Sequence, residues 1–295
     1  MQPPIFIDVT IGGARVEPIH AALLGSARSG EPDRYLAALL APAAARADLM
    51  AVAAFAAELA RVAHAVTREP AMADMRWQWW RDAIRLAPAT ATGHPIADRL
   101  RVAVERHSLA PAALLGLIDA RSCDLDPVPF ADDAALEHYF DSTEGALFAL
   151  SVQILGGDGT GSGQAWSGVA AGRAYGLARA LLGLRAALAR GHVPLPQTRL
   201  AAAGGSPAEL LTAPGPALLS GLVADLGAQA RRSLDGARLD VTKLPRQATI
   251  AVLPLALVES YLRASERAAR TGEVADVAPL TRIVRIAWAR WLGRW

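Results

Sequence analysis

Residues 33–82 read DRYLAALLAPAAARADLMAVAAFAAELARVAHAVTREPAMADMRWQWWRD. Proline favours the first turn of a helix and stops a helix that runs into it, so Pro42 and Pro70 should bracket one long helix, to about Arg68. Shorter helices are expected over 34–40 and 71–86. Within the long segment, apolar residues recur at the three- and four-residue steps of one helix face. These residues are Leu49, Val52, Ala53, Ala56, Leu59, Ala60 and Ala63.

The end of this stretch, residues 76–82, is unusually rich in large side chains. Trp77 and Trp80 fall on one side of a helix and Trp79 on another, because successive residues turn by about 100°. Two interpretations are open. The rings form a core anchor with one partly exposed member, or they form the aromatic wall of an apolar tunnel. In the second case the polar residues at the tunnel mouth would be Arg76, Gln78 and Arg81.

The composition of the whole chain predicts an all-α, single-domain protein. The chain has 295 residues, of which 53% are hydrophobic, and this is enough for a large core. Ala, Leu and Arg dominate while β-branched runs are scarce, which favours helices over strands. We expect an irregular N-terminal arm over 1–30, a helical domain over 31–278 and a basic amphipathic helix over 279–295.

Charge and targeting signals exclude several classes of protein. The formal net charge is +2 and the only lysine is Lys243, so no broad positive field suggests a nucleic-acid partner. The single Cys123 excludes an internal disulfide and a cysteine-based metal cluster. The N-terminus lacks a secretory pattern, and the longest uncharged apolar run, 248–258, is shorter than the roughly 18 residues of a membrane span. A cytoplasmic protein, or one peripheral at the membrane, is expected.

The C-terminal segment TRIVRIAWARWLGRW, residues 281–295, contains no acidic residue. Basic amphipathic helices with tryptophan can lie in a membrane interface, so a membrane surface is one candidate partner of 279–295. A terminal helix packed on the body of the protein is the alternative, and the shortness of the segment favours it. The alternating residues are Arg282, Arg285, Arg290 and Arg294 with Ile283, Ile286, Trp288, Trp291 and Trp295.

An acidic series lies in a predicted helix over 132–155. Asp133, Glu137 and Asp141 follow each other at four-residue steps, with Glu144 beside them. Such a stripe could hold Mg²⁺, because hard cations prefer clustered oxygen ligands. The apolar stripe of the same helix lies next to it, which favours carboxylates that face water.

Several motifs resemble the squalene/phytoene synthase family over about residues 30–270. The likeness is greatest to the divergent branch that includes the complex I assembly factor of mitochondria and its bacterial relatives. The resemblance implies an isoprenoid-synthase-like helical bundle around a central pocket. Besides the opening stretch, the motifs are LIDARSCDLDPVPF (117–130), ALEHYFDSTEGALFAL (135–150), GVAAGRAYGLARALLGLRAALARGHVPLP (168–196) and LPRQATIAVLPLALVESYLRASERA (244–268).

The sequence departs from the family at its two Asp-rich motifs. In the synthases these motifs bind the Mg²⁺ ions that remove diphosphate from two prenyl substrates. Here the first motif would fall near Ala60 and His64 and the second near Gly183 and Ala187. No Asp or Glu occurs between Asp158 and Glu209. We therefore expect no catalytic residue, metal or cofactor.

The leading interpretation is a non-catalytic relative that binds an apolar, isoprenoid-type ligand or a protein partner in an assembly or scaffold role. The residues expected to line its pocket are Arg34, Tyr35, Glu58, Arg61, Gln78, Trp79, Arg81 and Tyr175. The alternative is an enzyme, a prenyl-diphosphate condensing synthase of the phytoene or squalene type with a rearranged Mg²⁺ site. It would use Asp124, Asp126 and the acidic stripe over 133–141. That alternative requires Asp124, Asp126, Glu137 and Glu58 to meet in one cavity.

Overall fold

The computed structural model describes residues 10–11, 14–15, 18–65, 70–87, 90–156, 166–212 and 215–293. These residues form an all-α bundle with one short antiparallel strand pair, so the predicted fold class is confirmed. The α-helices are α1 (Pro18–Gly30), α2 (Pro32–Leu39), α3 (Ala43–Ala65), α4 (Pro70–Arg85), α5 (Pro95–His107), α6 (Pro111–Arg121), α7 (Asp133–Phe140), α8 (Ala146–Ile154), α9 (Val169–Leu182), α10 (Leu184–Ala189), α11 (Gln197–Ala202), α12 (Pro207–Thr212), α13 (Pro216–Val241), α14 (Val258–Thr271) and α15 (Pro279–Leu292). The other elements are the 3₁₀ helices η1 (Ser122–Leu125) and η3 (Ala248–Leu257), the π-helix η2 (Asp141–Gly145), and strands β1 (Thr10–Ile11) and β2 (Ala14–Arg15).

Helix α3 forms the centre of the bundle. Every residue from Asp48 to Ala57 is buried, and α3 packs on α1, α2, α5 and α8. The small alanine side chains let these neighbours approach closely. A Cβ atom on Gly30 would lie 2.4 Å from the Cβ of Ala57. The long helix predicted from Pro42 is therefore the core helix of the fold.

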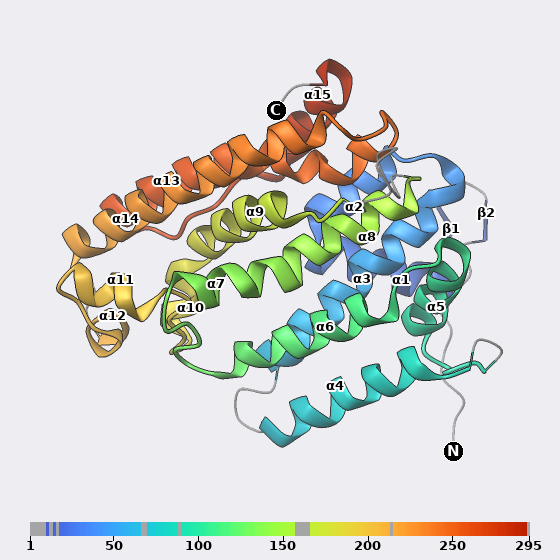
Figure 1. Ribbon diagram of the computed structural model, residues 1–295, viewed down its shortest axis with the longest axis horizontal. Coiled ribbons are helices and arrows are strands. Elements are labelled where there is room, and N and C mark those ends of the chain that lie inside the picture. The colour runs from blue at the N-terminus through green and yellow to red at the C-terminus, as the bar shows by residue number, and fades with distance from the viewer. Residues whose placement is uncertain are drawn as a thin grey trace.

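Helix α9 lies between α13 and α7 (Figure 1) and packs very closely on η2. Gly168, Gly172 and Gly176 repeat at four-residue steps along its contact face. A Cβ atom on Gly172 would lie 2.4 Å from the backbone nitrogen of Gly145, and one on Gly176 would lie 2.3 Å from the Phe140 ring. Only glycine leaves room for this contact, and it brings the polar residues of α9 next to those of η2.

One sequence prediction about an individual segment is wrong, and another is incomplete. The irregular arm expected over 1–30 does not extend through 18–30, which form α1. Leu23 and Ala27 fill the core contact of α1 with α3, but Ser and Gly around them conceal the helical period. The helix expected over 132–155 is confirmed as continuous helical structure over 133–154, but its middle, η2, has π geometry that the periodicity does not predict.

Segment Ala248–Thr271, made of η3 and α14, is long and apolar enough to cross a membrane by length and composition. However, 78% of its most apolar window is buried inside the bundle. Pro254 interrupts it and lacks the N–H that an α-helix needs, in keeping with the 3₁₀ geometry of η3. Its hydrophobicity is accounted for by its place in the core.

Candidate functional site

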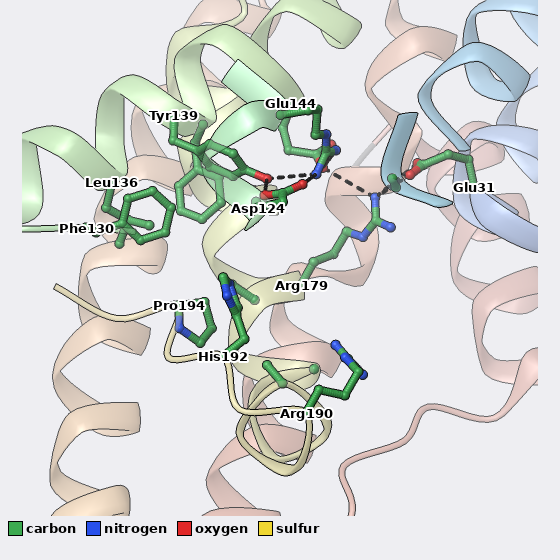
Figure 2. A pocket seen from close by; sticks show the side chains of 17 residues that line it. Glu31, Asp124, Phe130, Leu136, Tyr139, Glu144, Arg179, Arg190, His192 and Pro194 are labelled. Atoms are coloured by element: carbon green, nitrogen blue, oxygen red, sulfur yellow. Dashed lines mark hydrogen bonds and ion pairs between the residues drawn. The ribbon is translucent and has the colours of Figure 1, made fainter. Parts of the chain in front are cut away.

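A cavity of about 270 Å³ opens between α7, η2, α9, α10 and the chain that follows α10. Figure 2 shows Phe130, Leu136 and Pro194 along one side, and Arg179 reaching toward Glu31 on the other. The cavity thus has an apolar end and a charged end. Its lining residues are Glu31, Ala60, Arg121, Asp124, Phe130, Leu136, Tyr139, Phe140, Glu144, Gly176, Arg179, Ala180, Gly183, Ala187, Arg190, His192 and Pro194.

Two glutamates and two arginines form a ring of alternating charge at the charged end. Arg34 lies between the two acids, with Nη1 2.8 Å from Glu31 Oε2 and Nη2 2.8 Å from Glu144 Oε2. Arg179 Nη1 lies 2.9 Å from Glu31 Oε1 and 3.4 Å from Glu144 Oε1. Arg34 and both glutamates are buried. Each charge therefore has an opposite charge beside it, as a low-dielectric interior requires.

Arg121 extends this ring toward the apolar end. Its Nη1 lies 3.3 Å from Asp124 Oδ2 and donates to the Tyr139 hydroxyl at 2.8 Å. The hydroxyl in turn donates to Asp124 Oδ1 at 2.6 Å. Burial raises the pKa of Tyr139 well above its ordinary value, against the opposing effect of Arg121, and the Asp124 carboxylate raises it further. Tyr139 therefore stays protonated and acts as a hydrogen-bond donor to Asp124.

Glu144 enters this ring because η2 is a π-helix. The wider turn shifts the phase of the residues that follow Asp141, so Glu144 does not continue the outer stripe of α7. The prediction of water-facing carboxylates is wrong for Glu144, which is 5% exposed. Burial alone would raise the pKa of Glu144, but Arg34, then Arg179 and Arg121, outweigh it and hold that pKa at about 2.

Another buried carboxylate, Asp33, lies next to this ring in α2. Tyr175 donates to Asp33 Oδ2 at 2.6 Å, Tyr261 donates to the same oxygen, and Arg282 Nη1 of α15 lies 3.3 Å from Oδ1. Burial, and then the Asp33 charge, raise the pKa of both tyrosines above the ordinary value. Asp33 is thus a buried partner of three side chains, and it ties α15 to the body.

Residues 27–290 match the family model described as squalene/phytoene synthase. The chain belongs to the squalene/phytoene synthase family. It is 30% identical over 256 residues to the rat protein named NADH dehydrogenase (ubiquinone) complex I, assembly factor 6, covering 86% of this chain and 76% of the relative. The human protein of the same name is 29% identical over 241 residues, covering 81% and 72%.

Solved structures of family members share this fold. A squalene synthase, HpnC, from Alicyclobacillus acidocaldarius matches with a TM-score of 0.68 at 18% identity, over 85% of this chain and 95% of that one. A dehydrosqualene synthase crystallised with a ligand matches with a TM-score of 0.75 at 13% identity, over 92% and 95%. At these identities the likeness establishes the fold alone.

The cavity of this family member does not fit the Mg²⁺ cluster of the synthases. Three positions at which the missing motifs were expected, Ala60, Gly183 and Ala187, line the cavity and carry no ligand atoms in their side chains. The side chain of the fourth, His64, lies outside the described residues. Mg²⁺ needs free carboxylate oxygens, whereas the carboxylates in the described lining are bound to arginines. Across the described ranges, no group of three or more His, Cys, Asp or Glu could hold a metal ion.

The acids of the alternative, rearranged metal site do not converge. Asp124 lines the cavity, whereas Asp126 accepts a hydrogen bond from its own loop and Glu58 pairs with Arg61. Glu137 lies 2.6 Å from an arginine of α9, Arg173, outside the lining of the cavity. The rearranged metal site requires all four acids to meet in one cavity, and only Asp124 lies there.

The predicted pocket residues lie elsewhere. None of the eight, all within the described ranges, lines the cavity. Arg34 and Tyr175 belong to the buried network behind it, and Tyr35 packs partly buried against the core. Glu58 and Arg61 pair with each other and with Ser26 near the surface.

The remaining three predicted residues, Gln78, Trp79 and Arg81, lie on α4 away from the cavity. Gln78 bonds Asp82 of its own helix, and Arg81 pairs with an aspartate of α6. Trp79 is 40% exposed, while Trp77 and Trp80 are buried. The interpretation of a core anchor with one partly exposed ring is confirmed, and the tunnel wall is wrong.

Most polar residues that line the cavity were not predicted from the sequence, chiefly Glu31, Arg121, Tyr139 and Arg179. One signal for Arg179 exists in the family motif over 168–196, where a few arginines interrupt a glycine- and alanine-rich apolar segment. A long charged side chain in a buried helix needs a partner of opposite charge. The partner is 148 residues away in Glu31, and no local pattern indicates it.

Glu144 should make the protein sensitive to acid. Its pKa is about 2 in the folded protein and 4.5 ordinarily, so its stabilising contribution is fully present above about pH 4.5 and is lost as the pH falls toward 2. This difference corresponds to about 3 kcal/mol of unfolding free energy. Urea unfolding measured between pH 4.5 and pH 2 should show that the free energy of unfolding falls less in Glu144→Gln than in the wild type. An equal loss in both proteins would assign the acid sensitivity to other groups.

Proposed function

We propose that the protein is a non-catalytic member of its family that serves in assembling a respiratory NADH dehydrogenase and holds one apolar, isoprenoid-type ligand. The observation that carries this proposal is the chemistry of the cavity. Its lining carboxylates are neutralised by arginines, and alanine or glycine stands at the described positions of the missing motifs. The assembly role is supported by the relatives at about 30% identity, which are named as assembly factors of complex I.

The size of the cavity supports one ligand rather than two. Its volume of about 270 Å³ lies just below the range of about 300–1,000 Å³ that is common for small-molecule pockets. A condensing synthase must hold two prenyl chains at once. A single chain would lie against Phe130, Leu136 and Phe140, with Arg190 and His192 on the side where an anionic end could bind.

Purified protein incubated with labelled farnesyl diphosphate should release no diphosphate in response to Mg²⁺. The reason is that the cavity offers this metal no free carboxylate set. Product analysis and diphosphate release are measured with and without Mg²⁺, and a dehydrosqualene synthase serves as the positive control. Retention of the labelled molecule without turnover would support the ligand-binding role. Metal-dependent diphosphate release would overturn the non-catalytic assignment.

The assembly role is tested by deleting the gene in its host and measuring assembled NADH dehydrogenase on native gels. The deletion should reduce the assembled complex, and the wild-type gene should restore it. The variant Ala180→Phe would fill the cavity, and its gene should restore the assembled complex poorly. Ala189→Phe is the matched control, because Ala189 is an exposed alanine nearby in α10 that does not line the cavity. An unchanged complex in the deletion strain would overturn the assembly role.

A further inference from the structure

Helix α15 carries an apolar stripe that faces solvent. Leu280, Val284, Trp288 and Trp291 are 69%, 53%, 58% and 83% exposed. With Ala287 they follow each other at three- and four-residue steps, which places them on one face of the helix. A helix of a soluble protein ordinarily turns such a face toward the core, and here it is turned away.

The opposite face of α15 attaches the helix to the body. Within α15, which is described throughout, Ile286 and Ala289 are the buried residues, and the helix packs on η3 and α2. Arg282 fixes its first turn through Asp33 and through the ring of Tyr261, 5.3 Å from the guanidinium carbon. The apolar stripe is therefore held outward by a defined attachment.

A basic groove adjoins the C-terminal end of this helix. It has a volume of about 670 Å³ and lies between α15, the end of α13 and η3. Three arginines line it, Arg238, Arg246 and Arg290, and its described lining contains no carboxylate. Arg246 and Arg290 have no ion-pair partner in the part of the chain that the structure describes. The apolar lining of the groove is Val241, Leu244, Leu253, Ala289, Trp291 and Leu292.

We infer that α15 and this groove form a docking surface for a lipid bilayer that contains anionic phospholipids. The apolar stripe would enter the interfacial region, where tryptophan is favoured. Arg246 and Arg290 would bind the phosphate groups of the lipids, whereas Arg238 pairs with Asp235 of its own helix. The charge pattern supports this occupant. No acidic residue occurs from Val277 to the end of the chain.

A second copy of the chain fits this surface less well than a bilayer does. A symmetric dimer brings the same patch of both subunits together. It would therefore bring Arg285 and Arg290 of both α15 helices into one interface, without a carboxylate in either helix. Like charges at a dry interface are strongly unfavourable. An anionic bilayer has the complementary charge.

The test is sedimentation of the full-length protein with vesicles of phosphatidylcholine alone or mixed with phosphatidylglycerol. The protein should bind the anionic vesicles and bind neutral vesicles much more weakly. The double variant Arg246→Gln/Arg290→Gln should bind anionic vesicles about 30-fold more weakly, because each arginine near an anionic surface contributes about fivefold. Trp288→Ser/Trp291→Ser should lose binding to both kinds of vesicle.

Matched controls come from α4, which lies on the opposite side of the bundle from α15 (Figure 1). Arg76→Gln/Arg85→Gln removes the same charge from exposed positions, and Met72→Ser/Met75→Ser removes exposed apolar side chains. Both control variants should bind like the wild type. Thermal unfolding followed by circular dichroism verifies that each variant is folded.

Three results would overturn the inference. The first is an absence of vesicle binding by the wild type. The second is equal binding to neutral and anionic vesicles that the arginine variant does not change. The third is a dimer in light scattering that Trp288→Ser/Trp291→Ser abolishes in a protein that does not bind vesicles.

Discussion

Replacing Arg34 by methionine should lower the free energy of unfolding by about 3–5 kcal/mol. Arg34 is 5% exposed and bridges Glu31 and Glu144, and its guanidinium lies 4.8 Å from the centre of the Phe148 ring. Methionine retains much of the stem but leaves two buried glutamates to share Arg179. An uncompensated buried charge is far more costly than a lost ion pair in water. Urea unfolding followed by circular dichroism measures the effect.

The control for this prediction is Arg61→Met. Arg61 pairs with Glu58 at the same three-residue spacing and the same 2.8 Å as Arg34 with Glu31, but the Arg61 side chain is 51% exposed. Exposed pairs of this kind contribute up to about 1 kcal/mol. The difference between the two variants therefore isolates the effect of burial. Equal losses of stability would contradict the buried ring of charges.

Replacing Gly172 by alanine should destabilise the protein by about 3 kcal/mol. The added Cβ would lie 2.4 Å from the nitrogen and 2.5 Å from the Cα of Gly145. These are backbone atoms, which cannot rotate away, so α9 must move off η2. The same movement would pull Arg179 away from Glu144. The measurement is the midpoint of thermal or urea unfolding.

Gly221→Ala is the matched control in another helix. Gly221 lies in the interior of α13, and a Cβ atom there would meet nothing within 4 Å. Alanine is the better helix former by about 1 kcal/mol, so this variant should be as stable as the wild type or more stable. If Gly172→Ala behaved in the same way, the close packing of α9 on η2 would be disproved.

The sequence was sufficient for much of the fold because the fold depends on local patterns. The apolar period through Leu49 and Leu59 and the flanking prolines located α3. The spacing of Trp77 and Trp80 placed both rings on one side of a helix, and both are buried. The position of Ala60 was predicted from the family resemblance and not from a local pattern. The resemblance placed Ala60 at the site of a missing motif, and Ala60 does line the cavity.

The polar site could not be predicted because it depends on pairs far apart in the chain. Glu31 and Arg179 are 148 residues apart, and Tyr175 and Asp33 are 142 apart. The orientation of Glu144 also depends on the π turn of η2, which periodicity at 3.6 residues per turn does not represent. Asp33 has the residue type of a helix cap, and only the packed structure shows it to be a buried acceptor.

The ring of charges also constrains how the chain can fold. Its members come from the start of α2, from η2 and from α9, and without Glu144 of η2 the two arginines Arg34 and Arg179 would share Glu31 alone. A partly folded chain that buried this region early would retain an unpaired ion and be several kcal/mol less stable. These three segments must therefore dock together, so an intermediate with α2 and α9 buried and η2 unfolded should not accumulate.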